Sequence, residues 1–70
     1  MKEYDVVRVV AIRDGRFSGQ QPEWQRHPQV GDVGTILMDH GTAFEVECSG
    51  RGTGVTIWLD AMFPDELGPV

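Results

Sequence analysis

The sequence predicts an all-β fold: a small barrel of about five antiparallel strands with a long loop between the first two strands. Two observations predict it. Apolar and polar residues alternate over short stretches rich in β-branched and aromatic residues, as is typical of half-buried strands. No window keeps the i, i+3, i+4, i+7 apolar spacing of a helix. The 70 residues are expected to form a single domain, 1–70.

The stretch 43–48 shows the clearest alternation. Phe44, Val46 and Cys48 fall on one side of the predicted strand, and Glu45 and Glu47 fall on the other. Because successive side chains of a strand point to opposite faces, the first three are expected in the core. The glutamates are then expected to face water.

The stretch 55–60 repeats the pattern. Val55, Ile57 and Leu59 form the apolar side of the predicted strand, so Trp58 is expected to point away from the core. An exposed tryptophan usually has a covering loop, a ligand or a partner, since it contributes strongly to interfaces. We expect either that Trp24 of the long loop covers Trp58 or that an intermolecular contact does.

Three further strands are predicted, at residues 4–12, 34–38 and 67–70. The first has apolar residues on both sides, which indicates burial on both faces or a bend between two halves of a barrel. Pro64 fits the first position of a single helical turn at 64–66, directly before the short last strand, which is expected at an edge.

The connections complete the order of elements. Residues 39–42 are a short hairpin loop in which Gly41 is expected to have a positive φ, and residues 49–54 are a longer, Gly-rich hairpin loop. Asp32 suits a turn before the second strand. Residues 13–29 are polar and aperiodic, and loops of this length are often functional or mobile. Because an open meander exposes two edges, this order favours an SH3-like barrel.

The segment 30–70 resembles a family of small bacterial SH3-like proteins of uncharacterised function, found in genomes and in mobile gene cassettes. The motifs that carry the resemblance are Gly31-Asp32-Val33-Gly34-Thr35-Ile36, Phe44-Glu45-Val46-Glu47-Cys48 and Leu67-Gly68-Pro69-Val70. These motifs specify strands and turns, so the resemblance implies the fold and no activity. The loop 13–29 is longer than the family's pattern.

A weaker resemblance is to the plasmid-borne type II dihydrofolate reductases, SH3-like chains that assemble as tetramers around a pore. Their pore-lining run of valine, glutamine, isoleucine and tyrosine corresponds here to Val55-Thr56-Ile57-Trp58. Thr56 replaces the ligand-binding glutamine, and a hydroxyl has neither the reach nor the paired donor and acceptor of an amide. The resemblance therefore implies a mode of assembly and does not imply the activity.

Net charge and composition limit the kinds of partner and the cellular location that are expected. The formal net charge is −5, so the overall field repels a polyanion and nucleic acid is an unfavoured partner. No apolar run approaches the ~20 residues that span a bilayer, and residues 1–5 carry no apolar export signal. Cys48 is the only cysteine, which excludes an intrachain disulfide and fits a cytoplasmic protein.

No catalytic or metal-binding set is predicted, and no cofactor is expected. His27 and His40 are the only histidines, whereas a metal site needs three or four converging ligands. Cys48 is expected to be an inert buried thiol, because no basic neighbour in the sequence lowers its pKa.

Three functions stay open at this point. The first is a non-enzymatic interaction module that binds itself or another protein. The second is a ligand binder or enzyme whose site lies at an oligomer pore or under the loop 13–29. The third is a nucleic-acid-binding barrel that uses Arg8, Arg13, Arg16 and Arg26. The candidate partner- or ligand-binding residues are Trp58, Trp24, Thr56, Glu45, Glu47, Met62 and Phe63.

Overall fold

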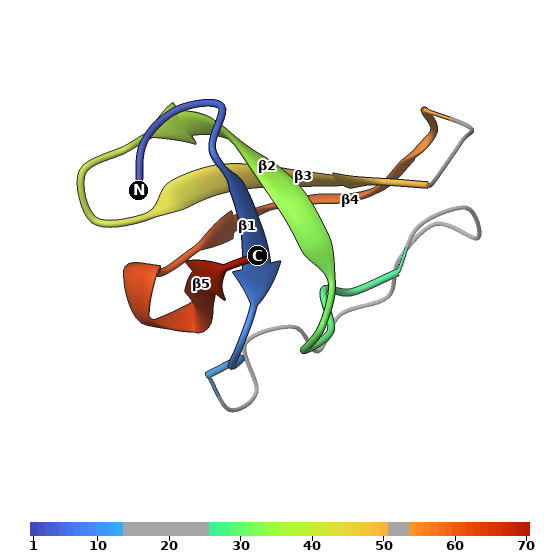
Figure 1. Ribbon diagram of the computed structural model, residues 1–70, viewed down its shortest axis with the longest axis horizontal. Coiled ribbons are helices and arrows are strands. Elements are labelled where there is room, and N and C mark those ends of the chain that lie inside the picture. The colour runs from blue at the N-terminus through green and yellow to red at the C-terminus, as the bar shows by residue number, and fades with distance from the viewer. Residues whose placement is uncertain (14–25, 51–53) are drawn as a thin grey trace.

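The computed structural model describes residues 1–13, 26–50 and 54–70, which form one curled antiparallel sheet (Figure 1). The elements of this part of the chain are β1 (Val6–Val9), β2 (Val33–Asp39), β3 (Phe44–Ser49), β4 (Thr56–Met62), the 3-10 turn η1 (Pro64–Glu66) and β5 (Leu67–Pro69). The strands lie in the order β4-β3-β2-β1-β5. The predicted all-β fold of five antiparallel strands, with its long connection between the first two, is confirmed.

Strand β2 is shared by the two halves of the sheet. Its first part pairs with β1, with Val6 opposite Thr35, and its second part pairs with β3, with Thr35 opposite Glu47. Gly34 lies where the halves meet: a Cβ atom there would stand 2.7 Å from the carbonyl oxygen of Glu47. The close approach lets the sheet curl into a small barrel-like fold (Figure 1).

The core lies inside this curl. It consists of the buried side chains Val7, Val9, Ile36, Phe44, Val46, Cys48, Trp58, Met62 and Leu67. The alternation predicted for 43–48 is confirmed, because Phe44, Val46 and Cys48 are buried.

The predicted orientation of Trp58 is wrong. Its side chain is 1% exposed, whereas Leu59, which was expected in the core, is 47% exposed. The register shifts between β3 and β4: Cys48 lies opposite Trp58, but Ser49 lies opposite Thr56. Ile57 is therefore the extra residue of a β-bulge. Residues opposite each other in an antiparallel pair share a face, so Trp58 points inward with Cys48.

The remaining elements agree with most of the predictions. The hairpin between β2 and β3 contains Gly41 with a φ of +90°, as expected, and η1 and the short edge strand β5 are present. Strand β1 is shorter than predicted and is buried on one side alone, with Val7 inward and Val6 exposed. Residues 14–25 of the long loop, including Trp24 and Arg16, lie outside the described residues, as do residues 51–53.

Candidate interaction surface

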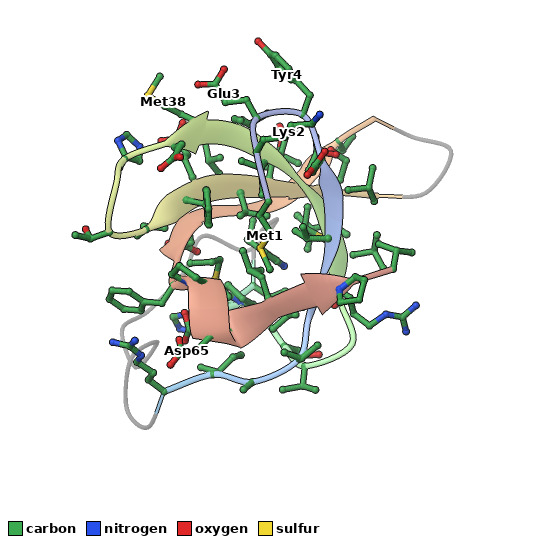
Figure 2. The ribbon with its side chains drawn as sticks, turned by 60° about the vertical axis from the view of Figure 1, so that its left-hand side comes forward. Met1, Lys2, Glu3, Tyr4, Met38 and Asp65 are labelled. Carbon is green, nitrogen blue, oxygen red and sulfur yellow. The ribbon has the colours of Figure 1, made fainter. Side chains whose placement is uncertain are left out.

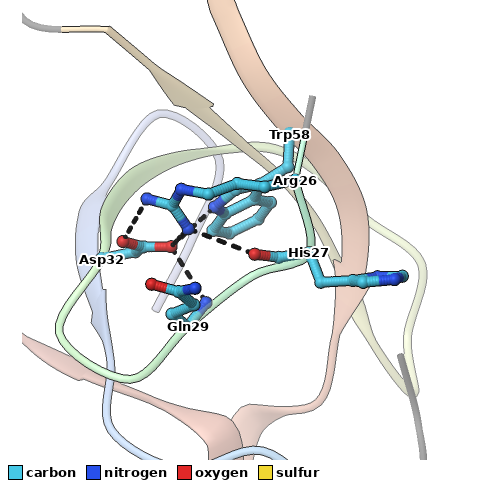
Figure 3. A network of polar contacts seen from close by, with 5 residues as sticks. All are labelled: Arg26, His27, Gln29, Asp32 and Trp58. Carbon is cyan, nitrogen blue, oxygen red and sulfur yellow. Dashed lines mark hydrogen bonds and ion pairs between the residues drawn. The ribbon is translucent and has the colours of Figure 1, made fainter. Parts of the chain in front are cut away.

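Trp58 belongs to a polar network centred on one carboxylate (Figure 3). Its indole Nε1 donates a hydrogen bond of 2.9 Å to Oδ2 of Asp32. The guanidinium of Arg26 donates to both oxygens of Asp32, at 2.8 Å each, and the backbone N–H of Gln29 donates to Oδ2 at 3.0 Å. The network joins strand β4 to the chain segment that leads into β2.

The electrostatics of this network are those of a structural ion pair. The hydrogen bonds from Arg26 lower the pKa of Asp32 against the opposing effect of burial, and the bonds from Gln29 and Trp58 lower it further. Asp32 in turn raises the pKa of Arg26. Both groups are therefore charged at neutral pH. Because the carboxylate is occupied by three donors from its own chain, we interpret Asp32 as an anchor.

A second anchor fixes the chain at Arg13, just before residue 14. The buried carboxylate of Glu66 accepts hydrogen bonds of 2.9 Å from the backbone N–H groups of Arg13 and Phe63. The guanidinium of Arg13 also lies 3.8 Å from the centroid of the Phe63 ring and 3.2 Å from Asp65. The chain is thus fixed to the barrel at residue 13 and again at residue 26.

The structure does not bring all the predicted site residues together in one place. Trp58 and Met62 are core residues, and Phe63 is half-buried beside Arg13, so these three candidates do not form an exposed binding surface. The other described members lie together on the outer side of β3 and β4. They are Glu45, Glu47 and Thr56, and the Thr56 hydroxyl donates to a carboxylate oxygen of Glu47 over 2.7 Å. Trp24 lies outside the described residues.

Reactive and metal-binding groups are sparse in the described part of the chain. Within it, no three His, Cys, Asp or Glu residues come together as metal ligands, and no pocket is found. Burial raises the pKa of the Cys48 thiol, which keeps that group protonated at neutral pH. The described residues also include no helix with the length and apolar character of a membrane span.

An exposed apolar surface lies elsewhere, on the outer side of β1 and β2. It consists of Val6, Arg8, Val10 and Val33, and we call it the β1–β2 face. Val6 and Val33 are 55% and 40% exposed, and Val10 is also exposed. The sequence reasoning missed this face because it interpreted the apolar residues on both sides of 4–12 as burial on both faces or a bend. The one hint in the sequence is Arg8, a charged residue on the same side of the strand as Val6 and Val10.

Tyr4 borders the β1–β2 face, two residues before Val6. Figure 2 shows its ring pointing away from the barrel at the same end as Met38. The backbone of Tyr4 has a φ of +69°, in the left-handed region that non-glycine residues rarely adopt. The N–H of Tyr4 donates to the carbonyl of Ile36 on β2 over 2.6 Å, which holds this conformation. An aromatic side chain is thereby held in the solvent.

Comparison with protein-family models, with curated proteins and with solved structures gives no match for this chain.

Proposed function

We propose that the protein is a non-enzymatic, cytoplasmic interaction module that associates with itself through the β1–β2 face. The observation that carries the proposal is the exposure of Val6, Val10 and Val33 on one side of adjacent strands. The outer side of an antiparallel sheet in contact with water is normally polar, as it is here at Glu45 and Glu47 on β3. The β1–β2 face departs from that rule.

Small size adds a physical reason for association. A 70-residue chain buries a smaller fraction of its surface than a larger domain does, so its stability margin is narrow. Each square ångström of apolar surface removed from water contributes about 25 cal/mol. A second copy that covers the valines stabilises the folded state by mass action. Self-association is also what the weaker resemblance to the plasmid-borne type II dihydrofolate reductases implies.

The two alternative functions have less support. The ligand-binding alternative includes Trp58 among the residues that line its site, but that indole is buried and bonded to Asp32. The nucleic-acid alternative depends on four arginines, of which Arg13 and Arg26 form ion pairs with Asp65 and Asp32. Those two guanidinium groups are already neutralised within the chain.

The test is sedimentation velocity of the full chain from micromolar to millimolar concentration. The double variant Val6→Thr with Val33→Thr makes the face polar and keeps β-branched side chains, which suit a strand. We expect the wild type to form dimers or larger oligomers and the double variant to associate at least tenfold more weakly. Val55→Thr is the matched control, because Val55 is equally exposed but lies outside the face, directly before β4.

Two results would overturn the proposal. One is a wild-type chain that remains monomeric at millimolar concentration. The other is association that the double variant and the Val55→Thr control weaken to the same extent. Circular dichroism of each variant shows whether the fold is retained, so that a loss of association is not confused with unfolding.

A further inference from the structure

Arg8 differs from the other arginines that the structure describes. Arg13 pairs with Asp65 and Arg26 pairs with Asp32. Arg8 is exposed on β1 and, within the described part of the chain, has no acidic side chain at ion-pair distance. It lies directly opposite Val33 on one side and Gly68 on the other, so its immediate neighbours on the sheet are apolar.

The strand register places acidic side chains at the opposite border of the same outer surface. Val6 lies opposite Thr35, and Thr35 lies opposite Glu47, so these three residues form one row across β1, β2 and β3. Neighbouring strands are about 4.8 Å apart, which puts Glu47 about 10 Å across the surface from Val6. Glu45 is two residues further along β3 on the same side. No ion pair engages Glu45 or Glu47 among the described residues.

This surface is complementary to itself. It has a cation, Arg8, among the valines of β1 and β2, and two anions on β3, on the far side of Thr35. In a two-fold symmetric dimer the same patch is used by both copies, and every contact occurs twice. A two-fold axis that passes midway between Arg8 and these glutamates, near Thr35 on β2, brings Arg8 of one copy onto the acidic border of the other.

We infer that the partner bound by the β1–β2 face is a second copy of this chain, in which Arg8 of each copy pairs with Glu45 and Glu47 of the other. This inference rests on the proposed self-association and specifies its geometry. A different, acidic protein would supply an opposite charge to Arg8 alone. A second copy of this chain also supplies a positive charge to the two glutamates. A basic residue next to apolar side chains favours an interface, because arginine is enriched in interface centres.

The test is a charge exchange between two variants, followed by sedimentation velocity or native mass spectrometry. The first variant is R8E and the second is E45K/E47K. Each variant alone places like charges against each other in the dimer, at both symmetric contacts. We expect each to self-associate about tenfold more weakly than the wild type, as reversing several exposed ion pairs implies. An equimolar mixture restores opposite charges at both contacts, so we expect a heterodimer of near wild-type affinity.

Net charge provides an internal control. E45K/E47K takes the formal net charge from −5 to −1, since two anions become two cations, and a smaller net charge by itself promotes association. Weaker association of this variant therefore reports the pairing and not the overall field. R8E takes the net charge from −5 to −7. H40E/T42E makes the same change at the exposed hairpin after β2, away from the face, and is expected to leave association within about threefold.

The outcomes separate the inference from the proposed function. If the wild type associates and Val6→Thr with Val33→Thr weakens it, but R8E behaves as H40E/T42E does, then self-association stands and the pairing is wrong. If both charge variants dissociate and their mixture forms no heterodimer, the pairing is also wrong. If the wild type is monomeric, the proposed function itself fails.

Discussion

The indole of Trp58 and the carboxylate of Asp32 are joined by a 2.9 Å hydrogen bond between residues 26 positions apart in the chain. The same carboxylate holds the guanidinium of Arg26 and the N–H of Gln29 (Figure 3). One acidic residue thus connects the largest core side chain to the segment that leads into β2. A single substitution at Asp32 removes all of these contacts together.

Asp32→Ala is expected to lower the free energy of unfolding by about 1.5–3 kcal/mol, since it leaves the indole N–H of Trp58 and the N–H of Gln29 without their acceptor. The Arg26 side chain is partly exposed, so its ion pair adds little to this figure. Urea unfolding followed by circular dichroism measures the loss. Asp65→Ala, which breaks the exposed pair with Arg13, is the control and is expected to cost about 0–1 kcal/mol. Equal losses in the two variants would contradict the anchoring role.

The Asp32 network also predicts how stability depends on pH. The folded state lowers the pKa of Asp32 below its unfolded value, near 3.9. Its contribution is therefore fully present above the unfolded pKa and is lost as the pH falls through the lower, folded pKa. Unfolding free energies measured from pH 7 down to pH 2 should show the wild type and Asp32→Asn converging at the acid end. A difference between them that stays constant over this range would exclude the linkage.

The sequence predicted β3 correctly because nothing interrupts its alternation. Phe44 and Val46 are buried, as their spacing indicates. The same reasoning failed in β4, where the bulge at Ile57 inserts one residue and reverses the assignment of faces for Trp58 and Leu59. The spacing of apolar residues along the sequence does not by itself reveal a β-bulge.

The site was harder to predict than the fold. The Trp58–Asp32 bond joins distant positions, so no local pattern reveals it. The β1–β2 face depends on which valines of β1 point inward, and a run rich in valine on both sides leaves that choice open. Only the pairing of β1 with β2 and β5 settles it, by placing Val7 and Val9 in the core.

The orientation of β4 can be tested by a pair of neighbouring substitutions. Trp58→Phe keeps an apolar ring and removes the indole donor, so we expect a loss of about 1–2 kcal/mol from the missing hydrogen bond and reduced packing. Leu59→Ala, on the exposed side, is expected to change stability by about 0.5 kcal/mol or less. Thermal unfolding followed by circular dichroism at low protein concentration gives both values. A larger loss for Leu59→Ala would restore the orientation first predicted from the sequence.

Gly34→Ala tests the close approach that allows the sheet to curl. The added methyl group would stand 2.7 Å from the carbonyl oxygen of Glu47, which is backbone and cannot move without disturbing β3. We expect a loss of about 1–3 kcal/mol, typical of overpacking. Gly68→Ala is the matched comparison, because its methyl group would meet a side-chain atom of Val10 at 2.9 Å. That side chain can rotate, so Gly68→Ala should lower the free energy of unfolding less than Gly34→Ala does. Urea unfolding measures both losses. A larger loss for Gly68→Ala would argue against a strained contact at Gly34.

Cys48 provides a chemical probe of the core. Its thiol is buried and burial raises its pKa, so little of the reactive thiolate exists in the folded state at pH 8. Alkylation by iodoacetamide should then require unfolding, and its rate in buffer should be lower than in concentrated urea by a factor on the order of 10³ or more. The raised pKa also predicts a loss of stability above about pH 8.5, where the thiol of the unfolded chain ionises and that of the folded chain does not. Native alkylation as fast as in urea would place Cys48 at the surface and contradict the inward face of β3.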